Sequence, residues 1–211
     1  MNAFRSAVLV VTAILSVLCL SAAPARGEVH YLPGGRAGDV PAIVQVEEKA
    51  GGLTTVRVDV RAFELQEMEG ESRFHQVSVP GWETTREAGR PALPVVAVPL
   101  LLSGQSQIID IRIVSRSFPG LVPAPFVGRP KRCESAGGWR FTYDAKTYAS
   151  DAPYPGSVVE TVETGMVRQA DLQVLLVRPF TFHPALRRLD VAYSVEVDLS
   201  VPLYRTGPLP H

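Results

Sequence analysis

Three prolines and a glycine constrain the chain between Gly89 and Pro99 more than any other feature of the sequence. Glycine adopts positive φ at little cost, whereas Pro91, Pro94 and Pro99 each fix φ at about −65° and have no N–H to donate. Each residue before a proline is also held extended. A strand over Val95–Leu102 therefore begins in a fixed direction, and proline excludes it from the middle of a sheet. We expect an edge or sheet-crossing strand.

Most of the remaining chain alternates between apolar and polar residues with the period of a β-strand. Two segments are predicted to turn apolar residues inward: Val56, Val58, Val60 and Ala62 in the first, and Ile109, Ile111 and Ile113 in the second. Phe63 falls on the polar face of the first segment. Leu172–Val177 is a near-continuous apolar run, which favours a central strand. The pattern predicts an all-β fold, an antiparallel β-sandwich of jelly-roll type.

Composition supports a packed β domain without an electrostatic attraction to nucleic acid. Apolar residues make up 46% of the chain, so its 18 prolines and 17 glycines indicate many turns rather than disorder. The formal net charge is +0, and no run of residues supplies a basic patch. Since phosphate binding depends on clustered positive charge, we expect no nucleic-acid partner.

The N-terminal residues 1–27 have the organisation of a secretory signal peptide. Arg5 precedes the apolar stretch Ala7–Leu20, and small residues suited to cleavage follow. The stretch is shorter than the roughly 20 residues that span a bilayer, so cleavage is preferred over an uncleaved anchor. We expect a secreted, cell-envelope or periplasmic product with one domain over residues 28–203, a linker or tail over 204–211, and no membrane span.

Few residues are candidates for catalysis or metal binding. No two of the four histidines have ligand spacing on one strand: His30, His75, His183 and His211. We therefore expect no metal and no cofactor. Loss of the signal peptide removes Cys19 and leaves Cys133 as the only thiol, which excludes an internal disulfide. Cys133 and a distant histidine could form a catalytic thiolate pair. The preferred interpretation is that Cys133 is a lone thiol in a loop. We therefore expect no enzymatic activity from this chain.

Several motifs occur in a fixed order between about Ser78 and Val201. They are Gly89-x-Pro91-x-Leu93-Pro94, then Tyr154-Pro155-Gly156, then Gly165-x-x-Arg168, and then a predicted hairpin that begins at Pro179 and continues through Pro184. Together these motifs resemble the N-terminal propeptide of gingipain-type cysteine peptidases. The resemblance implies a non-catalytic prodomain that inhibits a cysteine peptidase and assists its folding. Its partner would be the cognate catalytic domain, in cis or in trans, which is not part of this chain.

The composition changes over Ser117–Pro130, where prolines and glycines recur every few residues. This segment is predicted to be an extended, polyproline-like excursion with few backbone partners. The resemblance implies that a basic residue between the isoleucine strand and Tyr154 blocks the peptidase cleft. Arg132 is the best match, with Lys131 and Arg129 as neighbours. A solvated surface loop and a Lys-Arg cleavage site remain alternatives.

A second functional hypothesis is a stand-alone exported β-sandwich used for binding or surface assembly. In that case the predicted edge strand Val95–Leu102 would recruit a partner by strand addition.

Overall fold

The computed structural model describes residues 27–68, 73–126, 144–167 and 170–203. Within these ranges the chain forms β1 (Glu28–Tyr31), β2 (Ala42–Lys49), β3 (Leu53–Val60), β4 (Ala62–Glu67), β5 (His75–Ser78), β6 (Glu83–Thr84), β7 (Pro94–Leu102), β8 (Ile108–Pro119), α1 (Ala145–Tyr148), β9 (Val159–Val167), β10 (Ala170–Val177), β11 (Phe180–His183) and β12 (Arg188–Leu199). The ladders between these strands are antiparallel. The predicted all-β sandwich is confirmed.

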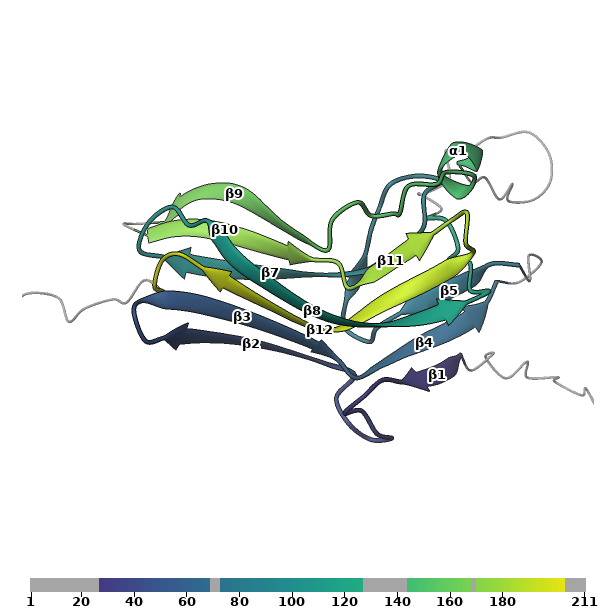
Figure 1. Cartoon of the computed structure of the whole chain (residues 1–211), viewed down its shortest axis with the longest axis horizontal. Coiled ribbons are helices and arrows are strands. Elements are labelled where there is room, and N and C mark those ends of the chain that lie inside the picture. Colours follow the sequence, from purple (N-terminus) through teal and green to yellow (C-terminus); the bar gives the residue numbers. More distant parts are fainter. Residues whose placement is uncertain (1–26, 69–72, 127–143, 168–169, 204–211) are drawn as a thin grey trace, which may run out of the picture.

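The β8–β12 pair runs through the molecule and joins its two halves (Figure 1). On the other side of β12, the first residues pair with β11 and the later ones with β3, which in turn pairs with β2. A second sheet has the order β6-β7-β10-β9, and a three-stranded sheet has the order β1-β4-β5. The long pair thus belongs to both halves of the sandwich.

A register shift in β12 divides the core into two clusters. Leu189 and Val191 pack in one cluster with β4, β5 and β11, whereas Val195 and Val197 pack in the other with β3, β7 and β10. The shift lies between Ala192 and Ser194 in the pairing with β8. Because side chains alternate along a strand, an inserted residue sends the following side chains to the opposite face. One strand can therefore supply both clusters.

The proline-rich strand lies where the sequence predicts. β7 pairs with β10 from Val96 to Leu102, and on its other side the two-residue strand β6 covers only Pro94 and Val95. β7 is therefore an edge strand along most of its length. β10 pairs with β7 and β9, so the apolar run over Leu172–Val177 forms a central strand, also as predicted.

The prediction that the β8 isoleucines are buried is wrong. Ile109, Ile111 and Ile113 are 56%, 40% and 44% exposed. Ile111 lies opposite the buried Val197 and therefore shares its face of the sheet. However, β8 is the outer neighbour of β12, and the opposing sheet leaves that edge open. Alternation correctly groups these residues on one face, but burial depends on what covers the face.

The prediction that Phe63 lies on a polar face is also wrong, because the strand does not continue through Arg61. β3 ends at Val60 and β4 begins at Ala62. The backbone N–H groups of Arg61 and Ala62 both donate to the carbonyl of Pro41, at 2.7 and 3.0 Å. At this break the alternation is interrupted, and both Ala62 and Phe63 are buried.

A group of charged side chains joins β2, β8 and β12 on the outer face of the large sheet. The Asp198 carboxylate accepts hydrogen bonds from Thr55 Oγ1 at 2.6 Å, Arg112 Nη2 at 2.9 Å and Lys49 Nζ at 3.2 Å. These donors, Thr55 first, lower the pKa of Asp198 from 3.8 to about 2. Hydrogen bonds to the ionised form stabilise it relative to the unfolded chain.

Asp198→Asn is expected to reduce the acid sensitivity of folding. The depressed pKa of Asp198 adds stability that is fully present above pH 4 and lost as pH falls toward 2. After allowance for solvent screening this contribution is about 1–2 kcal/mol. Urea unfolding at pH 7 and at pH 2.5 should show a smaller pH-dependent loss for Asp198→Asn than for the wild type. The exposed Glu47→Gln serves as control, and equal losses in all three proteins would contradict the prediction.

Candidate functional site

A single turn holds both ends of the segment that contains the predicted inhibitory residues. The Gly89 N–H donates to the carbonyl of Phe126 at 3.1 Å, and the Gly89 carbonyl accepts from the N–H of Asp144 at 2.8 Å. The N–H of Phe126 donates in addition to the carbonyl of Arg90 at 2.7 Å. We call Gly89, Arg90, Phe126 and Asp144 the loop base. Phe126 and Asp144, the described residues on either side of 127–143, therefore lie together at this turn.

The Gly-x-Pro-x-Leu motif gives the loop base its shape. Gly89 has a φ of 78°, a conformation that favours glycine. Pro91 forms a bridge with Pro125, and its carbonyl accepts a hydrogen bond from Thr85 Oγ1 at 2.8 Å. Leu93 is fully buried in the core, and its N–H donates to the same Thr85 oxygen at 3.1 Å. The motif thus fixes the turn to the core at its C-terminal end.

The predicted polyproline-like excursion with few backbone partners is wrong for residues 117–126. Residues 117–119 belong to β8 and pair with β12, and residues 121–125 are buried. The N–H of His75 donates to the carbonyl of Val122 at 2.9 Å, and the N–H of Ala124 donates to the carbonyl of His75 at 2.7 Å. The N–H of Ala92 donates to the carbonyl of Ala124 at 2.8 Å. This segment therefore lies between β5 and the proline turn.

Asp144 fixes the second end of the segment as the N-cap of α1. Its carboxylate accepts from the N–H of Lys146 at 3.1 Å and from Thr147 Oγ1 at 2.7 Å. The Thr147 hydrogen bond in particular lowers the pKa of Asp144. The Tyr148 hydroxyl donates to the carbonyl of Pro123 at 2.8 Å, so α1 is attached to the segment that leads into the loop base.

The Tyr154-Pro155-Gly156 motif reaches the same place from another part of the chain. The Tyr154 hydroxyl donates to Glu87 Oε1 at 3.1 Å, and the other Glu87 oxygen accepts from Arg90 Nη1 at 2.6 Å. Burial raises the pKa of Tyr154, so the phenol stays protonated and acts as a donor. Its backbone exchanges two hydrogen bonds with Phe182 of β11, at 2.8 and 2.7 Å. Two of the sequence motifs therefore meet at the loop base, and Tyr154 connects them to the β11 hairpin.

The positions of the other residues predicted from the motifs are as follows. Pro179 and Pro184 are buried at the two ends of β11, and the Pro184 carbonyl accepts from the N–H of Arg187 in the hairpin turn. Gly156 is exposed. The remaining predicted residues, together with the lone thiol, lie outside the described residues: Arg129, Lys131, Arg132, Cys133 and Arg168.

Sequence reasoning missed the residues that close the loop base, namely Glu87, Phe126, Asp144 and Tyr148. Asp144 carries a recognisable signal, because aspartate immediately before a helix-forming stretch is a common N-cap. The others carry none, since their roles come from contacts with residues distant in sequence.

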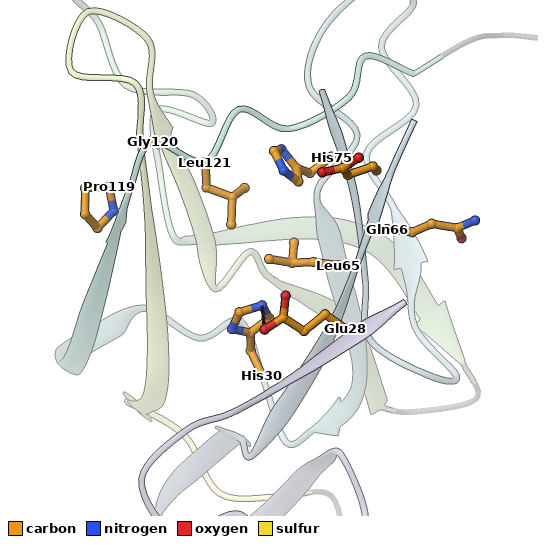
Figure 2. Close-up of a pocket in the computed structure, with 9 residues that line it drawn as sticks. Glu28, His30, Leu65, Gln66, His75, Pro119, Gly120 and Leu121 are labelled. Atoms are coloured by element: carbon orange, nitrogen blue, oxygen red, sulfur yellow. Dashed lines mark ion pairs between the residues drawn. The ribbon is translucent and has the colours of Figure 1, made fainter. Parts of the chain in front are cut away.

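A pocket of about 460 Å³ opens among β1, β4, β5 and the residues after β8 (Figure 2). His30 and His75 lie at opposite sides of it, and His30 Nε2 is 3.7 Å from Glu28 Oε1. Within the described ranges, no group of three or more His, Cys, Asp or Glu side chains is arranged to hold a metal ion. No described helix has the length and apolar character needed to cross a bilayer.

Gly89→Ala is expected to destabilise the fold by about 1–2 kcal/mol, because an L-residue is strained at positive φ. Gly104→Ala is the matched control, since Gly104 does not adopt positive φ and a methyl group there would meet no atom within 4 Å. Urea unfolding should separate the two variants. Equal stability of Gly89→Ala and Gly104→Ala would show that the turn does not depend on glycine.

Comparison with known proteins supports the resemblance drawn from the motifs. The Propeptide_C25 family model matches residues 35–206. No curated protein sequence matches the chain. One similar solved structure is described as "Structural insight into zymogenic latency of gingipain K from Porphyromonas gingivalis", with 17% identity, a TM-score of 0.61, and coverage of 83% of this chain and 100% of that one. Another is a complex of Porphyromonas gingivalis RgpB pro- and mature domains, with 16% identity, a TM-score of 0.59, and coverage of 79% and 88%.

The family match extends over most of the chain and includes every motif that meets at the loop base. At identities below a fifth, the two solved structures establish the shared fold. The chain belongs to the Propeptide_C25 family, the propeptides of gingipain-type cysteine peptidases.

Proposed function

We propose that the chain is a secreted, non-catalytic prodomain that inhibits a gingipain-type cysteine peptidase and assists its folding. The family match supports a peptidase propeptide. The observation that carries the inhibitory role is the loop base, where Gly89 is hydrogen-bonded to both ends of the segment that contains Arg132. The partner is the cognate catalytic domain, in cis or in trans.

The inhibitory contact is an arginine held in an acidic specificity pocket. A guanidinium group forms two parallel hydrogen bonds with a carboxylate, which gives both affinity and geometric selectivity. Tethering the segment at both ends reduces the conformational freedom lost on binding. Arg132 would occupy the pocket, and Lys131 and Arg129 would contact its rim. The RgpB structure is described as a complex of pro- and mature domains, which supports this kind of partner.

Export follows from the same proposal. Residues 1–27 would be removed as a signal peptide, leaving the domain over residues 28–203 and a linker or tail over 204–211. Cys133 would have no catalytic role, and the peptidase would supply all of the chemistry. Mass spectrometry of the exported product should find an N-terminus close to Glu28. An intact N-terminal segment would contradict this part of the proposal.

Titration of an active peptidase tests the inhibitory role. The full chain, purified in the form that the host exports, should inhibit an arginine-specific gingipain-type peptidase at concentrations well below about 10 µM. A papain-type cysteine peptidase is the control and should keep its activity. The folding role is tested by refolding the denatured catalytic domain with and without the chain. If the chain inhibits neither an arginine-specific nor a lysine-specific gingipain-type peptidase, the proposed inhibition is wrong.

A further inference from the structure

β8 has an open sheet edge. Its residues Ile109–Ser117 are all exposed, and four of them are large and apolar, namely Ile109, Ile111, Ile113 and Val114. In the described part of the chain β8 pairs with β12 alone, so its outer N–H and C=O groups have no strand neighbour. Such an edge is a template for another strand.

The other long edge strands carry features that prevent pairing. β7 has Pro94 and Pro99, which cannot donate to a ladder. β2 has two adjacent glutamates near its end. β9 has Gly165 at positive φ. β8 has no proline before its last residue, and its charges are of both signs. These differences single out β8 as the edge that is available for pairing.

The charges of β8 are self-complementary in an antiparallel arrangement. With Ile113 opposite its own copy, Asp110 of each chain lies opposite Arg116 of the other. Arg116 is exposed and stacks over the Phe118 ring at 5.3 Å, and its guanidinium has no carboxylate partner among the described residues. Opposite charges placed directly across antiparallel strands stabilise the pair, whereas like charges destabilise it. The register with Arg112 opposite Arg112 is therefore disfavoured.

We propose that two copies of the chain associate by antiparallel pairing of β8 about a two-fold axis at Ile113. The pairing is isologous, since the same strand serves both copies. It joins the two large sheets into one and places the isoleucine stripes side by side, so that each covers part of the other. The association needs no peptidase and stands apart from inhibition.

Sedimentation velocity of the full exported chain over about 1–200 µM tests this pairing. The wild type should form a dimer as concentration rises. Ile113→Lys should raise the dissociation constant at least tenfold, because two ammonium groups would meet at the axis. Val44→Lys is the matched control, since Val44 is similarly exposed on β2 and should leave the dimer intact. A wild-type monomer throughout this range would overturn the proposal.

A charge exchange tests the register independently. Arg116→Asp alone should weaken the dimer. The new carboxylate at position 116 of each copy would lie opposite Asp110 of the other copy, and like charges repel. Asp110→Arg combined with Arg116→Asp should restore it. A dimer that is unaffected by Ile113→Lys, or a double variant that stays as weak as the single one, would show that β8 is not the interface.

Discussion

Arg132→Ala is expected to raise the inhibition constant against an arginine-specific gingipain-type peptidase by tenfold or more. A buried arginine anchor that pairs with a carboxylate is the kind of contact that dominates an interface. Tenfold corresponds to about 1.4 kcal/mol. The inhibition constant should be measured with a peptide substrate at several salt concentrations, because exposed charge pairs weaken in salt whereas buried ones change little.

Two variants separate the pocket contact from general attraction between charges. Lys131→Ala removes the same charge next to Arg132 and should change inhibition far less. Arg132→Lys keeps the charge but loses the two parallel hydrogen bonds, so it should lie between the wild type and Arg132→Ala for an arginine-specific partner. If Arg132→Ala and Lys131→Ala weaken inhibition equally, Arg132 does not occupy the specificity pocket.

Phe63→Ala is expected to cost about 3–5 kcal/mol of folding free energy, because it leaves a cavity in a close-packed core. The Phe63 ring is fully buried. It packs edge-on against Phe118 and Phe180, with ring centroids 5.2 and 5.5 Å apart, and stacks on His30 at 5.3 Å. The change therefore loosens contacts among β1, β4, β8 and β11 at once. Urea or thermal unfolding of the purified chain measures the loss.

Leu186→Ala is the control for Phe63→Ala, because Leu186 is 61% exposed and its removal should change stability by less than about 0.5 kcal/mol. Phe63→Leu keeps much of the apolar volume and should fall between the two. If Phe63→Ala unfolds at the same urea concentration as Leu186→Ala, Phe63 does not have the central packing role described above.

Local backbone chemistry accounts for the parts of the fold that the sequence predicts well. Prolines without an N–H place β7 at an edge, and the uninterrupted apolar run places β10 at the centre of its sheet. Both properties belong to the strand itself. The motifs also indicate the family and the position of the rigid turn at Gly89.

Burial is harder to predict, because it depends on the neighbours of a strand. Ile111 and Ile113 have the pattern of core residues, yet β8 lies beyond the opposing sheet and they are exposed. Phe63 has the pattern of a surface residue, but the break at Arg61 turns it into the core. The loop base joins segments around residues 89, 126 and 144 by backbone hydrogen bonds, which leave no trace in side-chain patterns.

The most direct test of the central claim is the size of the native product in its source cells. An antibody against Arg90–Leu102 should be used in a denaturing blot, with and without a general cysteine-peptidase inhibitor. Our account predicts a large precursor that matures to a fragment of about 20 kDa, the mass left after signal removal, and that accumulates when the inhibitor is present. A single band of about 20 kDa under both conditions, with no larger parent, would contradict a propeptide in cis and favour a stand-alone module.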